Sequence, residues 1–353
     1  MVKKMKILFF CGHKSPYGLA HLEPLLQSDF DVIAMVLATD KRWNIFREIL
    51  LGKNYYSTSD FSIRKAKVLL KKIIPKEILN KLKDEKETIS IKKIVNKYKI
   101  PIWYIDNVNC KEFIQKARNN NIDLIISAAY PQIFSKDLIS IAPYGAVNFH
   151  PSLLPKFRGA HPHYWAIVKG ETESGLSAHF MTEHIDDGEI IAQIKFPIKD
   201  YNYNQLYKKI LFETPNIVNM VENYFLHNKS TSIPQDPLKG SYYRNDREIH
   251  HRIFWNIYTA MEIFNLIRGG NAFCFFRNQK LIVEECSITE TNRNLTNNIV
   301  VENGIIVDLG KDYVAINVKL GVLNIKQVRY KNIKLSVSKF IVKYKPLVGE
   351  RFD

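Results

Sequence analysis

Runs of apolar residues alternate with amphipathic stretches over much of the first 230 residues. The runs "KILFF" and "DVIAMVLAT" are typical of buried strands, and "YGLAHLEPLLQS" between them has the spacing of a short helix. The alternation returns beyond residue 100, where "IPIWYI", "IDLIISAAY" and "GAVNFH" predict strands separated by helical stretches. This strand–helix–strand order predicts an α/β fold with a mostly parallel sheet covered by helices.

Three further segments follow a different pattern. A Lys-rich helical stretch at about 44–98 interrupts the alternation, and we interpret it as an insertion. A helix over roughly 203–227 ends a first domain of residues 1–230. A Pro/Gly/Lys-rich linker at 231–250 then leads to one helix and several short strands at 251–353, which predict a small C-terminal β domain of the OB-like type.

The net charge is +16, and much of the basic excess lies between residues 41 and 100. Such a block can face nucleic acid, an anionic membrane or a phosphorylated substrate, but we slightly favour a solvated surface in a chain rich in Lys, Ile and Asn throughout. No apolar run is long enough to span a bilayer, and the short N-terminal run lacks the cleavage site of a leader. The four cysteines show no paired spacing, so we expect a cytoplasmic protein.

Two polar residues stand at the end of the strand "GAVNFH". Side chains alternate along a strand, so Asn148 and His150 point to one face and Phe149 points to the other. Pro151 ends the strand at the carboxyl edge of the sheet, where open α/β folds place their sites. An equally weighted alternative is that these polar groups only cap loop backbone.

The turn "IDDGE" between two later strands adds a carboxylate. Asp186 and Asp187 are both typical turn formers, and the sequence pattern does not choose between them. If one of them reaches His150, it can orient the imidazole and stabilise its charged form. An Asn/His/Asp set without a Ser or Cys nucleophile suits attack by a substrate's own amine on a carbonyl.

The neighbouring histidines raise the alternative of a metal site. His150, His161 and His163 lie close in sequence, and His179 or His184 could join them. Their spacings match no compact ligand motif, and no paired cysteines support one. We therefore expect no metal.

The stretch "NFHPSLLPKFRGAHP…GETESGLSAHFMTEHIDDGEIIAQ" resembles the core of the folate-dependent formyltransferases. The family pattern of Asn-x-His, Ser-Leu-Leu-Pro, Arg-Gly loop and hydrophobic-Asp-x-Gly turn occurs here in order, with Ser174-Gly175 where Thr-Gly is usual. The resemblance implies a Rossmann-like formyltransferase N-terminal domain, an OB-like C-terminal domain, and 10-formyltetrahydrofolate as formyl donor.

The same resemblance implies roles for individual residues. Asn148, His150 and Asp186 form the catalytic set, which selects Asp186 over Asp187 and leaves open whether Asp187 shares its role. The residues implied to bind the folate lie in three stretches of the sequence and are Ala128, Ala129, Tyr130, Ser152, Leu153, Leu154, Pro155, Met181, Thr182 and Ile185. The residues expected to face the acceptor are Arg158, His161, His163 and Trp165, for which ordinary packing is the alternative.

Two acceptors compete. We favour the amine of a nucleotide-linked amino sugar, a dTDP- or UDP-amino sugar of surface polysaccharide such as the lipopolysaccharide O-antigen. Methionyl-tRNA is the alternative acceptor, and the basic block and the OB-like tail support it. The argument against it is that the insertion occupies the position where transfer-RNA enzymes carry a basic loop. A formyltetrahydrofolate hydrolase and a non-catalytic relative are further alternatives, and a homodimer stays open as the assembly.

Overall fold

The computed structural model describes most of the chain, which divides into two compact units. The first unit takes in residues 1–150, 177–193 and 211–235, and the second takes in 151–176, 194–210 and 236–353. The described residues within these units are 4–12, 15–38, 94–227, 231–289 and 302–353. Most of the expected basic insertion, residues 44–93, therefore lies outside the described residues.

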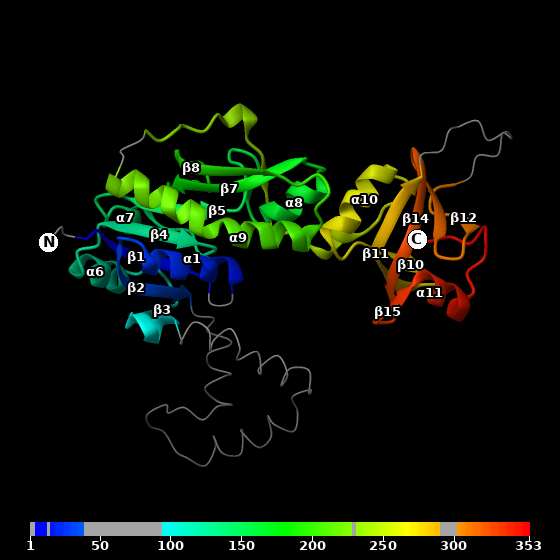
Figure 1. The fold of residues 1–353 in the computed structure, drawn as a ribbon, viewed down its shortest axis with the longest axis horizontal. Coiled ribbons are helices and arrows are strands. Elements are labelled where there is room, and N and C mark those ends of the chain that lie inside the picture. Colours follow the sequence, from blue (N-terminus) through cyan, green and yellow to red (C-terminus); the bar gives the residue numbers. More distant parts are fainter. Residues whose placement is uncertain (1–3, 13–14, 39–93, 228–230, 290–301) are drawn as a thin grey trace, which may run out of the picture. The chain divides into compact units, whose positions relative to one another are not determined.

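A seven-stranded sheet runs in the order β3-β2-β1-β4-β5-β7-β8 (Figure 1). Neighbouring strands pair in parallel from β3 to β5, and β5 pairs antiparallel with β7. The strand bounds are β1 Lys6–Cys11, β2 Asp31–Ala38, β3 Ile102–Ile105, β4 Leu124–Ala128, β5 Ala146–His150, β7 Glu173–Phe180 and β8 Ile190–Pro197. The predicted mostly parallel α/β sheet is confirmed.

Helices pack on this sheet through apolar side chains. Helix α1 (Pro16–Gln27) lies on β1 and β4, and it begins where the Ser15 hydroxyl accepts a hydrogen bond from the backbone N–H of Gly18. Helix α6 (Lys111–Asn119) packs its Phe113 against Phe10 of β1. The described residues also form α7 (Lys136–Ile139) and α9 (Tyr203–Glu222), the latter continued by the π-helix η1 (Asn223–His227), while α8 (Pro162–Val168) belongs to the second unit.

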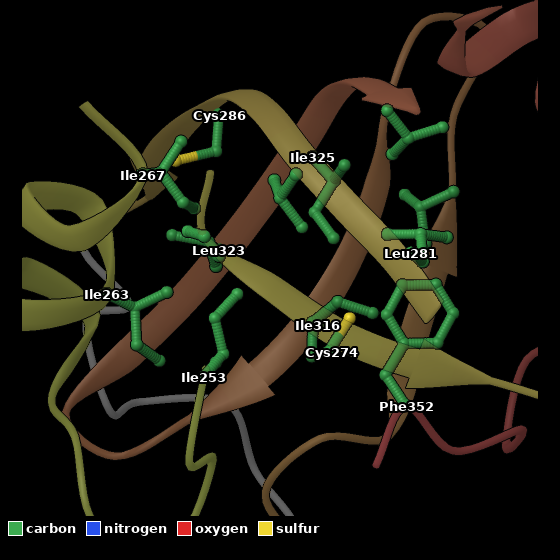
Figure 2. Close-up of a cluster of buried hydrophobic side chains, with 14 of the residues drawn as sticks. Ile253, Ile263, Ile267, Cys274, Leu281, Cys286, Ile316, Leu323, Ile325 and Phe352 are labelled. Atoms are coloured by element: carbon green, nitrogen blue, oxygen red, sulfur yellow. The ribbon is translucent and has the colours of Figure 1, made fainter. Parts of the chain in front are cut away.

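The C-terminal residues form an antiparallel sheet in the order β10-β11-β14-β13-β12, with β15 paired to β14. Its core contains Ile263 and Ile267 of the preceding helix together with strand residues such as Leu323 (Figure 2). The element bounds are α10 Ala260–Gly269, β10 Phe273–Phe276, β11 Gln279–Thr289, β12 Ile306–Leu309, β13 Val314–Val318, β14 Gly321–Tyr330, β15 Ile333–Ser336 and α11 Val337–Tyr344. The expected C-terminal β domain is confirmed, and its OB-like topology stays a prediction.

The expected linker at 231–250 carries several short elements. Strand β9 (Tyr242–Tyr243) pairs in parallel with β6 (Arg158–Gly159). The 3₁₀ turns η2 (Pro237–Lys239) and η3 (Glu248–His251) flank this ladder. Across the part of the chain that the structure describes, no helix combines the length and the apolar character needed to cross a membrane.

Candidate active site

Strand β5 presents Asn148 and His150 on one face, as the alternation predicts. In the antiparallel ladder with β7, Asn148 lies opposite His179 and His150 lies opposite Ser177. Phe149, between them, is buried on the other face, where its ring stacks on His21 of α1 with centroids 4.5 Å apart. The sheet therefore holds the amide and the imidazole two residues apart on the same surface.

The carboxylate of Asp186 reaches both of these side chains. His150 Nδ1 lies 3.4 Å from Asp186 Oδ2, and Asn148 Nδ2 lies 3.4 Å from Asp186 Oδ1. Asp187 is engaged elsewhere, since its Oδ1 accepts a hydrogen bond of 2.5 Å from the Thr182 hydroxyl. The geometry thus separates the two aspartates that the turn sequence alone left equivalent.

A third side chain, His179, shares the same carboxylate. Its Nε2 lies 3.4 Å from Asp186 Oδ1 and 3.4 Å from Asn148 Nδ2. Its Nδ1 lies 2.8 Å from the Phe180 carbonyl oxygen, which can only accept, so Nδ1 carries a proton. In the neutral ring Nε2 then accepts from the Asn148 amide, and in the charged ring it donates to Asp186.

Burial strengthens the interactions of this group. The side chains of His179 and His150 are 2% and 5% exposed, and that of Asp186 is 13% exposed. Charges and dipoles this far from water interact more strongly than they would at the surface. Sequence reasoning missed His179 as a member of this site and considered it only as a metal ligand. The available signal was its register opposite Asn148, which depends on pairing β5 with β7.

The first unit also holds six of the residues expected at the folate. Ala128 ends β4 beside Phe149 of β5, so Ala129 and Tyr130 follow at the same edge of the sheet. The Tyr130 hydroxyl is buried with no hydrogen-bond partner among the described residues, and this burial raises its pKa. The remaining residues of this set are Met181, packed on the core, Thr182, exposed and bonded to Asp187, and Ile185, 40% exposed.

The "SLLP" residues belong to the second unit, where backbone contacts hold them. Ser152 is buried, and its hydroxyl donates to the Lys156 carbonyl oxygen at 2.8 Å. Leu154 is buried as well, while Leu153 and Pro155 are half-buried. Their predicted contact with a folate stays a prediction.

The residues expected to face the acceptor lie in very different surroundings within the second unit. His161 has a half-exposed side chain whose Nδ1 is 3.5 Å from Asp246 Oδ1. Trp165 is buried, stacks on Tyr243 and donates its indole N–H to the Arg244 carbonyl oxygen. The two others are Arg158, in the β6–β9 ladder, and His163, whose Nε2 lies 2.9 Å from the Tyr203 hydroxyl. Their acceptor roles stay predictions, and His161 offers the most accessible side chain.

Two models of known protein families match this chain. The formyl transferase model matches residues 64–221, which include Asn148, His150 and Asp186. The formyl transferase C-terminal domain model matches residues 248–345, which hold the antiparallel sheet. The chain belongs to the formyltransferase family. Residues 222–247 of this formyltransferase lie between the two matches, and the linker expected at 231–250 stays a prediction.

Proteins of two kinds are similar to this chain in sequence. The bifunctional polymyxin resistance protein ArnA of Wigglesworthia glossinidia brevipalpis is 32% identical over 228 residues, covering 63% of this chain and 35% of that protein. Methionyl-tRNA formyltransferase of Staphylococcus aureus is 29% identical over 208 residues, covering 58% of this chain and 67% of that enzyme. The chain thus spans about a third of the length of the first relative.

Solved formyltransferase structures share the fold. The N-formyltransferase from Helicobacter canadensis, in complex with folinic acid and dTDP-3-aminofucose, has a TM-score of 0.57 at 17% identity, covering 91% of this chain and 98% of that one. A sugar N-formyltransferase from Shewanella sp FDAARGOS_354 has a TM-score of 0.53 at 18% identity, covering 80% and 97%. At such low identity these likenesses show the fold alone.

Proposed function

We propose that this formyltransferase moves a formyl group from 10-formyltetrahydrofolate to a primary amine in the cytoplasm. The observation that carries the proposal is the Asp186 carboxylate, 3.4 Å from both His150 Nδ1 and Asn148 Nδ2. An amide donor, an imidazole and a carboxylate in one buried cluster suit proton transfer and oxyanion stabilisation. A nucleophilic side chain is not needed when the acceptor amine itself attacks.

The surroundings of this cluster fit a folate. The buried Tyr130 hydroxyl without a partner among the described residues, the exposed Ile185 and the backbone at the end of β4 combine hydrogen-bonding and apolar surface. A flat heteroaromatic ring needs both kinds of contact. When bound, the folate supplies the activated formyl carbon on which the amine attacks.

The side chains then divide the work of the reaction. Asp186 contacts Nδ1 of His150 and so orients the imidazole within the cluster. The Asn148 amide stabilises the negative charge that develops on the formyl oxygen, and one such donor contributes roughly 2.7–4 kcal/mol. His150 takes a proton from the attacking amine, and Asp186 stabilises the imidazolium that results. The imidazolium returns that proton to the folate nitrogen as its bond to the formyl carbon breaks, so tetrahydrofolate leaves neutral at that nitrogen.

For the acceptor we favour an amino sugar linked to a nucleotide, as used for surface polysaccharide. The support is the fold likeness to the Helicobacter canadensis enzyme, which binds dTDP-3-aminofucose, and the sequence similarity to ArnA. The half-exposed His161 beside Asp246 adds a polar pair suited to a small hydroxylated ligand.

Methionyl-tRNA is the second candidate, and one observation favours it. Residues 313–349 contain eight Lys or Arg residues and no Asp or Glu, and five of the eight lie on strands β14 and β15 and helix α11. Such a run supplies the positive charge that phosphate-backbone binding requires. The similarity to the Staphylococcus aureus enzyme agrees with this acceptor.

One assay separates the acceptors. The purified protein is incubated with 10-formyltetrahydrofolate and either dTDP- or UDP-amino sugars or charged initiator tRNA, and both folate release and acceptor mass are followed. We expect formylated sugar nucleotide. Formyl transfer to tRNA alone would replace our acceptor, folate release without any acceptor would indicate a hydrolase, and no release at all would contradict formyl transfer.

A further inference from the structure

The turn that carries Asp186 forms hydrogen bonds with residues 231–235, a segment more than 40 positions later in the sequence. Ile190 and Ile233 form an antiparallel bridge, with N–H···O distances of 2.8 and 2.9 Å in its two directions. One residue earlier in that segment, the Ser232 hydroxyl donates to the Glu189 carboxylate. Residues 231–235, which we call the strap, therefore run along the turn and its following strand.

Gln235, the last residue of the strap, contacts the backbone of the turn itself. Its Nε2 donates to the carbonyl oxygens of Asp186 at 2.9 Å and of Gly188 at 2.7 Å. An amide nitrogen carries two protons, so a single side chain satisfies both carbonyl groups. Gln235 lies in the first unit with Asp186, and the two residues are 49 positions apart in sequence.

The backbone of this turn is strained at one point and tightly packed at another. Asp186 has φ of +52°, in the left-handed region that residues other than glycine rarely adopt. At Gly188, a Cβ atom would lie 2.0 Å from the Phe180 carbonyl oxygen, so the turn presses against β7. A strained conformation of this kind persists only when its surroundings hold it.

We propose that Gln235 is a positioning residue for formyl transfer, acting through the Asp186 turn. The inference rests on the proposed function, because it assigns Gln235 to the same reaction. The carboxylate of Asp186 lies 3.4 Å from each of His150, Asn148 and His179, so a small rotation of the Asp186 backbone breaks all three contacts. Gln235 prevents that rotation by holding the carbonyl oxygens on both sides of Asp187.

The test is a double-mutant cycle with the full-length protein. Gln235→Met keeps the size of the side chain and removes both donors, and it is combined with Asp186→Asn. Rates are measured as folate release in the presence of the acceptor that supports wild-type turnover. We expect Gln235→Met to lower kcat about 10- to 100-fold, the loss that a displacement of about 1 Å can cause. In the Asp186→Asn background the same change should lower kcat less than about threefold.

Ser232→Ala is the matched control, since it loosens the strap at Glu189 without touching either carbonyl group, and we expect less than a threefold loss. If Gln235→Met fails to fold by circular dichroism, Gln235→Asn is used, because it keeps the amide but is too short to reach both carbonyl oxygens. Unchanged kcat, or equal losses in the wild-type and Asp186→Asn backgrounds, would overturn the positioning role. Absence of folate release from the wild-type protein would instead contradict the proposed function.

Discussion

The carboxylate of Asp186 lies 3.4 Å from Nδ1 of His150, and both side chains are largely buried. This pair joins the end of strand β5 to a turn that follows β7, so the site depends on the antiparallel pairing of those two strands. A buried carboxylate beside a ring nitrogen orients the imidazole and stabilises its charged form. The predictions below start from this pair.

Asp186→Asn should lower kcat about 10²- to 10⁴-fold. The substitution keeps the size of the side chain but removes the negative charge that stabilises the His150 imidazolium. Steady-state folate release measures the effect. Asp187→Asn is the matched control on the neighbouring residue, which contacts Thr182 instead, and it should cost less than about tenfold. A larger loss at Asp187 than at Asp186 would reverse the assignment of the two aspartates.

His179→Leu should lower kcat about tenfold or more. The leucine leaves the Asn148 amide and one oxygen of Asp186 without their shared partner, so both groups gain freedom to move. The loss of a partner for buried polar groups should also lower the free energy of unfolding by roughly 1–3 kcal/mol. Kinetics and urea denaturation measure the two effects. His184→Leu is the control, because His184 is exposed in the loop that follows β7. It should change kcat by less than about twofold and the free energy of unfolding by less than about 0.5 kcal/mol.

His21 should make the protein less stable in mild acid. It is fully buried against Phe149, and this burial lowers its pKa from 6.5 to about 4, against the smaller opposing effect of its hydrogen bond to the Tyr17 carbonyl oxygen. The unfolded chain therefore binds a proton more readily than the folded one between pH 6.5 and pH 4. Folding stability falls as the pH is lowered through this window, by about 2 kcal/mol between pH 7 and pH 5.

Urea denaturation at pH 7 and pH 5 tests this contribution. The difference between the two pH values should be about 2 kcal/mol smaller in His21→Leu than in the wild-type protein. His251→Leu gives a comparison at a histidine of the second unit that is paired with Asp246. Identical pH dependence in the wild-type protein and His21→Leu would show that His21 does not cause the effect.

Much of the site could be predicted from local sequence. The alternation in "GAVNFH" places Asn148 and His150 on one face, and the structure confirms that arrangement. The apolar runs around them also predict the parallel sheet, because few other folds bury apolar strands that are separated by helices. These features depend on periods of two and of 3.6 residues, which are visible in any short stretch of chain.

Other parts of the site depend on contacts that local sequence does not encode. Asp186 and Asp187 differ only in how the turn orients them, and the left-handed backbone at Asp186 decides that orientation. His179 joins the site through the register of β7 against β5. Gln235 lies in a stretch that looks like a linker, and its two hydrogen bonds reach back nearly fifty residues.

The central claim is formyl transfer through His150, and acceptor formylation by wild-type protein and His150→Ala tests it most directly. Both proteins are incubated with 10-formyltetrahydrofolate and a dTDP- or UDP-amino sugar, and the mass of the sugar nucleotide is followed over time. We expect the wild-type protein to produce formylated sugar nucleotide and His150→Ala to do so at least about 100-fold more slowly. A His150→Ala rate close to that of the wild-type protein would contradict the account.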